Sequence, residues 1–339
     1  MNNQILRVGI VGCGDMGNRH AAAWAEVPGA QLYAVVDNKP ESACALAERY
    51  HAPHCCHDYR QALALPDLDV VSVCIPTAFH AEVSLFAMQQ HKHVFCEKPI
   101  ALTLEDADAM IALAERQGVQ LGVAFLRRYS PVFEQLRTLL ASGAVGRPVM
   151  AHSVDIREQR PKLMMHDREL TGGAVVDMGV HIFDTWANLF DSPAVEVFAQ
   201  GLLLATGRPE LTDIAELAHD TAAVTVRYAS GDCGIFVITW GLPLGVQPEP
   251  TPERIYAPDG LVEVTLDFDQ QWLRLNTPES GWETLVASDE NLYSLEIAAF
   301  AADIRSGRAP RTGGVDGREA LRVALAAVEA IETRRVVHL

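Results

Sequence analysis

The sequence predicts an α/β protein in two domains, a doubly wound parallel sheet over residues 1–124 and a second domain over residues 125–339. Three observations lead to this prediction. The chain has 339 residues, and a single hydrophobic core usually belongs to a shorter chain than this. Up to about residue 124, short apolar runs alternate with helical patterns, as in the repeated strand–helix units of a parallel sheet. Further along, alternating apolar and polar residues indicate antiparallel strands with one buried face.

The first element is a strand that leads through a glycine-rich turn into a helix. Residues 5–11 form a short apolar run, which is the pattern of a parallel strand covered on both faces. Gly12, Gly14 and Gly17 follow with the spacing G-x-G-x-x-G, which serves a tight turn, a close approach to pyrophosphate, and helix packing on the strand. The N–H groups of the helix start would bind the pyrophosphate. The expected cofactor contacts in this turn are Gly12, Gly14, Asp15, Met16 and Gly17.

A second apolar strand, residues 32–37, ends in an acidic residue at the position that a dinucleotide fold requires. Asp37 lies 37 − 17 = 20 residues beyond Gly17, where a carboxylate accepts hydrogen bonds from the ribose hydroxyls. A carboxylate there repels a 2′-phosphate. We therefore expect NAD as the cofactor, with NADP less favoured, although Lys39 nearby moderates that preference.

The alternation of helices and strands continues to the end of the first domain. Helical patterns cover residues 40–50, 78–90 and 103–118, and apolar strands cover residues 67–76, 93–99 and 119–125. Ligands of such sheets bind at the carboxyl ends of the strands. The residues expected there are Pro76, Thr77, His80, Glu97, Lys98 and Pro99, with packing against the loop as the alternative role for His80.

The second domain contains an apolar helix that carries an unexpected charged stripe. Within residues 172–184, Asp177, His181 and Asp184 have the spacing i, i+4, i+7, which places them on one face of a helix. Buried charges are costly unless they are paired, so this face should border a polar cavity or a partner. This pattern is typical of a helix that lines a catalytic site.

The rest of the second domain reads as a sheet with covering helices. Strands are expected within residues 221–240, around a Ser-Gly-Asp turn, and at residues 260–268 and 271–277. A last helix is expected at residues 317–333, and the proline-rich residues 243–253 form either an ordered loop or a mobile lid.

Composition narrows the classes of partner. The net charge of −17, without a dense basic run, argues against nucleic acid. No basic leader precedes a long apolar run near the start, so a cytoplasmic protein without a membrane partner is expected. The seven cysteines are odd in number and scattered, which favours reduced thiols over disulfides. Residues 51–57 are rich in His and Cys, but neighbouring side chains of an extended segment point to opposite sides, so no metal site is expected.

Five segments in order give the chain a resemblance to a known family. With "GCGDMGNRH", "IPTAFH", "CEKP", "FLRRYSP" and "GGAVVDMGVHIFD", it resembles the Gfo/Idh/MocA oxidoreductases, which include inositol dehydrogenase. The resemblance implies an N-terminal Rossmann domain and a C-terminal α/β domain with a large, mostly antiparallel open sheet. It further implies assembly as a homodimer or homotetramer through that sheet.

The resemblance also implies roles for single residues. Lys98, Asp177 and His181 would surround the reacting alcohol. Glu97 would contact the nicotinamide ribose, and Arg127 the cofactor or the substrate, whereas Arg128 is as well suited to a salt bridge. A cis peptide bond before Pro99 would aim Lys98 into the cleft.

The expected activity is NAD-dependent oxidation of a secondary alcohol on a ring polyol or sugar. His181 is favoured as base, Lys98 as polariser and Asp177 as orienter, with Lys98 as base the alternative. Two other functions stay open, a glycosidase that uses NAD for transient oxidation and a non-catalytic dinucleotide-binding regulator. The candidate substrate contacts are Gln159, Arg160, Lys162, His166, Asp167 and Arg168.

Overall fold

The computed structural model describes residues 5–266 and 270–339, and these residues form two compact units. The first unit contains the chain up to Leu126 together with Asn291–Arg318, and the second contains Arg127–Glu290 and Glu319–Leu339. The expected boundary after residue 124 is thus two residues early. The assignment of all later residues to the second domain is corrected, because residues 291–318 pack with the first unit.

The first unit is built on a six-stranded parallel sheet. The strand order is β3-β2-β1-β4-β5-β6, so the sequence returns to the middle of the sheet after β3. This is the order of a Rossmann sheet, in which the ligand crosses the carboxyl ends of the strands where the order reverses. The strands are β1 (Leu6–Val11), β2 (Ala30–Val36), β3 (His54–Cys56), β4 (Val70–Val73), β5 (His93–Cys96) and β6 (Leu121–Val123).

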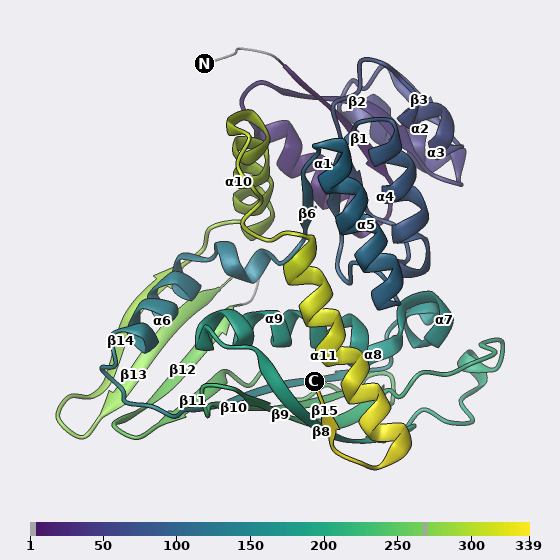
Figure 1. The fold of residues 1–339 in the computed structure, drawn as a ribbon. Coiled ribbons are helices and arrows are strands. Elements are labelled where there is room, and N and C mark those ends of the chain that lie inside the picture. The colour runs from purple at the N-terminus through teal and green to yellow at the C-terminus, as the bar shows by residue number, and fades with distance from the viewer. Residues whose placement is uncertain (1–4, 267–269) are drawn as a thin grey trace. The chain divides into compact units, whose positions relative to one another are not determined.

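Helices cover the sheet of the first unit, and one of them, α10, comes from a segment late in the sequence. They are α1 (Asp15–Glu26), α2 (Pro40–Arg49), α3 (Tyr59–Leu63), α4 (His80–Gln89), α5 (Leu104–Gln117) and α10 (Leu292–Ser306), with a 3₁₀ turn η1 (Thr77–Phe79) before α4. Helix α10 packs against α1 (Figure 1). Phe300 of α10 contributes to the same core as Trp24 and Phe95, which explains why a segment so late in the sequence belongs to this unit.

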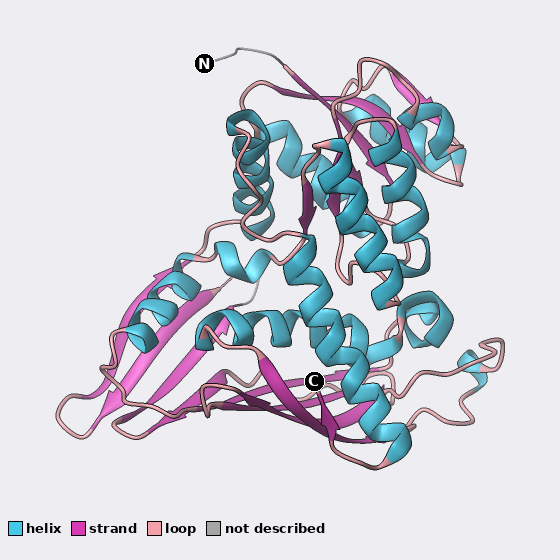
Figure 2. Cartoon of the chain, viewed as in Figure 1, coloured by secondary structure: helices cyan, strands magenta, loops and turns pink. Residues whose placement is uncertain are grey.

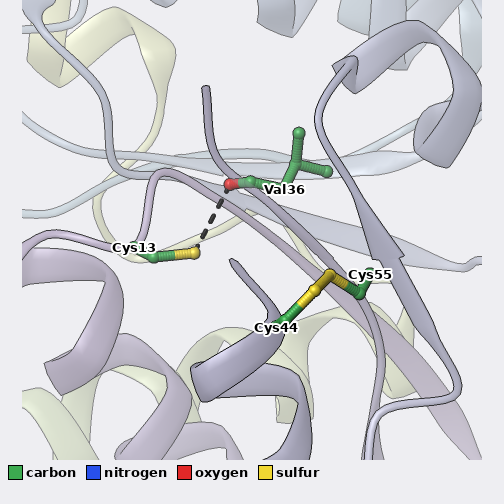
Figure 3. The surroundings of a disulfide bond; sticks show 4 residues. All are labelled: Cys13, Val36, Cys44 and Cys55. Atoms are coloured by element: carbon green, nitrogen blue, oxygen red, sulfur yellow. Dashed lines mark hydrogen bonds between the residues drawn. A yellow bond between two sulfur atoms is a disulfide. The ribbon is translucent and has the colours of Figure 1, made fainter. Parts of the chain in front are cut away.

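A disulfide bond joins α2 to β3 in the first unit. Cys44 and Cys55 are bonded, with Cα atoms 5.4 Å apart, whereas Cys13 next to them keeps a free thiol that donates to the carbonyl oxygen of Val36 (Figure 3). The expectation that all seven thiols are reduced is therefore wrong for this pair. The bond depends on the packing of α2 against its neighbouring strand, which the spacing of cysteines along the sequence does not reveal.

The second unit is built on a nine-stranded sheet with the order β14-β13-β12-β11-β7-β10-β9-β8-β15. Only the pair β7 and β10 is parallel, so the expected mostly antiparallel sheet is confirmed. The strands are β7 (Met150–Glu158), β8 (Ala194–Leu202), β9 (Thr221–Tyr228), β10 (Cys233–Leu242), β11 (Glu253–Ala257), β12 (Gly260–Leu266), β13 (Gln271–Thr277), β14 (Gly281–Ser288) and β15 (Val337–His338). The last two residues of the strand expected at residues 260–268, Asp267 and Phe268, lie outside the described residues.

Helices lie along one face of this sheet (Figures 1 and 2). Helix α6 packs on β12, β13 and β14, and the helices α8 and α9 pack on β10. The helical segments are η2 (Leu126–Tyr129), α6 (Pro131–Ala141), η3 (Leu163–His166), α7 (Arg168–Thr171), α8 (Gly173–Asp177), α9 (Gly179–Phe190), η4 (Pro209–Leu211) and α11 (Gly314–Thr333). Within the described residues, no helix combines the length and apolarity that a membrane span needs.

Candidate functional site

The glycine-rich turn of the first unit has the form that pyrophosphate binding requires. Gly12 has φ +95°, and a Cβ atom there would lie 2.3 Å from the carbonyl oxygen of Cys74. At Gly17 a Cβ atom would lie 1.8 Å from the carbonyl oxygen of Gly12, so these two glycines are needed for the turn and for packing. Gly14, in contrast, has no neighbouring atom within 4 Å of an added Cβ. It leaves open space at the start of α1, where a phosphate can approach the backbone N–H groups.

Asp37 follows β2 and is tied to the same turn. One carboxylate oxygen accepts from the N–H of Cys13 at 2.7 Å and the other from the N–H of Lys39 at 2.8 Å. Each oxygen has a second lone pair, so the carboxylate can still accept from ribose hydroxyls while the backbone fixes its position. Burial and the charge of Asp37 raise the pKa of the Cys13 thiol to about 12, so this thiol stays protonated at neutral pH. The residues present therefore fit NAD.

The segment after β4 contains three of the expected cofactor contacts. Pro76 caps the 3₁₀ turn that begins at Thr77, which is buried, as is His80. The ring nitrogens of His80 lie 2.7 Å from the carbonyl oxygen of Pro99 and 2.8 Å from that of Ile75. Burial lowers the pKa of His80, although the two carbonyl oxygens oppose this change. This ring therefore joins two backbone segments, the packing role named as its alternative, and its contact with the cofactor stays a prediction.

The Glu-Lys-Pro segment follows β5 at the same edge of the sheet. The buried carboxylate of Glu97 accepts from His20 Nε2 at 3.0 Å and from the N–H of Lys98 at 3.1 Å. Burial opposes ionisation of Glu97, but these contacts and the nearby cations keep its pKa below the usual value. Each oxygen has a second lone pair, as in Asp37, and the expected contact of Glu97 with the ribose stays a prediction. The peptide bond between Lys98 and Pro99 is cis, as expected, and Lys98 is partly exposed.

In the second unit, the helix expected over residues 172–184 is interrupted. Helix α8 ends at Asp177 and α9 begins at Gly179. A Cβ atom at Gly179 would lie 2.8 Å from the ring of Phe183, so the close approach of that ring requires glycine at the break. The glycine pair before α8 is also required, because Gly172 and Gly173 both have left-handed φ angles, +77° and +76°.

The three charged residues of the expected stripe have two different roles. Asp177 and His181 are partly exposed, although most of their neighbours along α8 and α9 are buried. Asp184 is buried and accepts from Arg128 at 3.2 Å. The salt bridge expected for Arg128 is thus confirmed, and Asp184 is its structural partner. Asp177 and His181 are left as the accessible acid–base groups of this helix pair.

Arg127 lies in the second unit, where it forms an ion pair with Glu253 at 2.6 Å. The same carboxylate also binds Ser153 of β7. Glu253 therefore connects the start of β11 both to β7 and, through Arg127, to the turn before α6. This contact neither requires nor excludes a cofactor near Arg127. The contact of Arg127 with the cofactor or the substrate therefore stays a prediction.

A cavity of about 390 Å³ opens at the end of β7 in the second unit. Its wall includes β7 residues from Val154 onward, the turn Gln159–Pro161, the loop Gln247–Pro252, and Arg127. Met178 and Ile182 of the helix pair also line it, one residue after Asp177 and one after His181. The cavity therefore borders the helix segment that carries the candidate catalytic residues, and its volume suits a small polar molecule.

Of the six candidate substrate contacts, two line this cavity and three others have structural contacts. Gln159 and Arg160 belong to the wall as described. His166 accepts from the N–H of Arg160, Asp167 caps α7, and Arg168 pairs with Glu332 at 2.6 Å. Lys162 precedes the turn η3. Tertiary packing decided between these neighbours, which look equally polar in the sequence.

Two buried features escaped the sequence prediction. Trp240 of β10 lies under Arg160, with the guanidinium carbon 5.4 Å from the ring centroid, and its Nε1 donates to Asp155 at 3.2 Å. Glu296 of α10 is fully buried, and neither of its oxygens has a hydrogen-bond partner among the described residues. In the sequence, the signals for these two features were a tryptophan within a predicted strand and an acidic residue within an apolar helical segment.

Models of protein families match both units of the chain. Residues 6–125 match the family described as "Oxidoreductase family, NAD-binding Rossmann fold", and residues 133–253 match the "GFO/IDH/MocA C-terminal domain". Together these matches cover more than half of the chain, on either side of the boundary between the two units.

Relatives and solved structures match this chain over almost its whole length. The myo-inositol 2-dehydrogenase of Thermotoga maritima is 30% identical, with 98% of each chain covered, and an oxidoreductase of Bacillus subtilis is 28% identical, with 98% of this chain and 95% of that protein covered. The aldose-aldose oxidoreductase of Caulobacter crescentus, solved with glycerol, has a TM-score of 0.87 at 25% identity, with 99% of this chain and all of that chain covered. A levoglucosan dehydrogenase solved with NADH and levoglucosan has the same TM-score at 22% identity, covering 98% and 99%, and so shows the shared fold.

Proposed function

Because the chain belongs to the GFO/IDH/MocA oxidoreductase family, we propose that it oxidises a secondary alcohol of a cyclic polyol or sugar with NAD as the cofactor. The observation that supports this most strongly is that the chain has both a cofactor-binding turn and a pair of accessible acid–base groups. The first unit has a turn with open space for a pyrophosphate at Gly14, and the second has accessible Asp177 and His181 beside a cavity. The inositol dehydrogenase among the relatives supports the substrate class.

The proposed catalytic residues are Lys98, Asp177 and His181. NAD, when bound, accepts the hydride from the carbon that bears the hydroxyl group. His181 Nε2 removes the hydroxyl proton, since Nδ1 is buried, and the Lys98 ammonium donates a hydrogen bond to the oxygen as its negative charge grows. Asp177 orients the hydroxyl group or the imidazole. In the competing assignment Lys98 is the base and His181 is not.

Single substitutions test this set. Lys98→Met and His181→Asn should each lower kcat/KM by about 10²–10⁴, the usual contribution of acid–base groups, while NAD binding persists. The matched control is His91→Asn, at an exposed turn with φ 58° that asparagine accommodates.

The readout is NADH absorbance with a panel of inositols, sugars and sugar acids. Full turnover by Lys98→Met would overturn the catalytic assignment. Accumulation of NADH in proportion to substrate consumed distinguishes a dehydrogenase from a glycosidase that reoxidises its cofactor in each cycle. NAD binding without oxidation of any member of the panel would favour a dinucleotide-binding regulator.

Assembly and location are part of the same proposal. The nine-stranded sheet has helices along one face, and Phe198, Tyr256 and Trp282 on its strands are exposed. We propose that a second copy of the chain covers this surface, giving a homodimer or homotetramer, which light scattering coupled to gel filtration measures. A dehydrogenase that releases NADH needs a continuous supply of NAD, which supports a cytoplasmic location.

A further inference from the structure

The cavity at the end of β7 contains three arginines that differ in their partners. Arg127 is paired with Glu253, and Arg157 with Asp155. Arg160 lies over the ring of Trp240, and its Nε is buried without a hydrogen-bond acceptor among the described residues. The chain therefore neutralises two of the guanidinium groups through hydrogen-bonded carboxylates and gives the third an aromatic surface.

The main chain and the ring beneath hold Arg160 in place. Its N–H donates to Nε2 of His166 at 3.1 Å, which fixes the turn after β7. Trp240 is buried, and its Nε1 donates to Asp155, so the aromatic surface is itself held by a hydrogen bond. A cation–π contact with a fixed ring restricts the motion of the guanidinium, whose N–H donors suit bidentate binding of a carboxylate.

The carboxylates of the cavity wall are largely in use. Asp155 binds both Arg157 and Trp240, Glu253 binds Arg127, and Glu158 accepts from Gly245 and Gln247. Glu249 is exposed in the loop at the rim. A ligand carboxylate could therefore reach Arg160 without displacing a hydrogen-bonded partner in the chain.

Arg160 has charged neighbours of both signs. Burial and the neighbouring guanidinium of Arg157 lower the pKa of Arg160, while Asp155 and Asp177 oppose this change. Arg160 and Met178, the residue after Asp177, line the same cavity, so Arg160 lies near the candidate catalytic residues of this unit. A carboxylate at Arg160 would relieve the repulsion between the two arginines and would set the substrate's position relative to Asp177.

We propose that Arg160 is a specificity-determining residue that binds a carboxylate of the substrate, so that the preferred substrate is a sugar acid and not a neutral polyol or sugar. This inference rests on the proposed dehydrogenase function and narrows its substrate class. The carboxylate accepts two N–H groups of the guanidinium, and the hydroxyl to be oxidised lies elsewhere on the sugar. The reaction itself is unchanged.

The test compares two sugars that differ only in the proposed group. D-Glucuronate and D-glucose share a ring, but the first has a carboxylate where the second has a hydroxymethyl group. The wild-type protein with NAD should oxidise D-glucuronate with a kcat/KM at least about tenfold higher than D-glucose. Arg160→Gln should lower this ratio to about one, because the variant no longer has the charge that distinguishes the two sugars.

The matched control is Arg227→Gln, an exposed arginine of β9 in the same sheet that pairs with Glu196. It should leave the ratio unchanged. A wild-type preference for D-glucose, or an equal loss on both sugars in Arg160→Gln, would overturn the inference while leaving the dehydrogenase function intact.

A binding measurement keeps the inference separate from turnover. If neither sugar is oxidised, calorimetric titration of D-glucuronate into the NADH-saturated protein decides the matter. Binding that is weakened at least about tenfold by Arg160→Gln, but not by Arg227→Gln, supports the carboxylate site even if the proposed reaction fails. No binding of D-glucuronate, or binding that is insensitive to Arg160, refutes it.

Discussion

Gly14 provides the sharpest test of the dinucleotide site, because the structure separates its role from that of Gly17. An alanine Cβ at residue 14 would meet no atom within 4 Å, and the backbone there has φ −71°, which alanine readily adopts. Gly14→Ala should therefore change the free energy of unfolding by less than about 1 kcal/mol, since loss of a favoured N-cap glycine and loss of unfolded-chain entropy have opposite signs.

The effect on the cofactor should be much larger. The open space at Gly14 is where a pyrophosphate would approach the N–H groups at the start of α1. A methyl group there would remove at least one charge-assisted hydrogen bond, which is worth about 1.5–3 kcal/mol. We expect NAD to bind roughly 10- to 150-fold more weakly to Gly14→Ala, a change that isothermal titration calorimetry resolves.

Gly17→Ala is the contrasting variant. Its Cβ would lie 1.8 Å from the carbonyl oxygen of Gly12, so the turn must shift and the protein should lose stability as well as NAD binding. Thermal unfolding of the two variants without NAD measures this difference. The reasoning is refuted if Gly14→Ala binds NAD within about threefold of the wild type, or if it unfolds at as low a temperature as Gly17→Ala.

Two more predictions follow from buried or hydrogen-bonded carboxylates. Asp37→Asn keeps an oxygen for the Cys13 N–H but removes the charge, so the ratio of kcat/KM for NAD to that for NADP should fall at least about tenfold, and an unchanged ratio would contradict the role given to Asp37. Burial, together with the charge of Glu97, raises the pKa of Glu296 well above its usual value. The stability associated with protonated Glu296 is therefore fully present below the unfolded-state pKa of about 4.3 and is lost as pH rises through the folded-state pKa. Glu296→Met should raise the free energy of unfolding at alkaline pH by about 1–3 kcal/mol and flatten this pH dependence in urea titrations, and parallel pH profiles for variant and wild type would show that Glu296 does not ionise as inferred.

Local patterns were sufficient for most elements of the fold. The glycine spacing at residues 12–17, the position of Asp37 and the hairpin around residues 230–232 depend on neighbours a few residues apart, and the structure has each as expected. The last helix begins at Gly314, three residues before the expected start at residue 317. The expected stripe of three charges was divided, because Asp184 pairs with Arg128, far away in the sequence.

By itself, the sequence determined that the chain has a dinucleotide-binding sheet followed by a mostly antiparallel one, and it identified Lys98, Asp177 and His181 as candidates for catalysis. The two sheets and the charged stripe follow from periodicity and short spacings, which the chain carries locally, whereas the catalytic roles of Lys98, Asp177 and His181 came from the resemblance to a family. The tertiary structure decided that residues 291–318 join the first unit, that Cys44 is bonded to Cys55, and that Arg160 lines the cavity while Arg168 does not. Each of these outcomes depends on packing between elements, which no short stretch of sequence encodes.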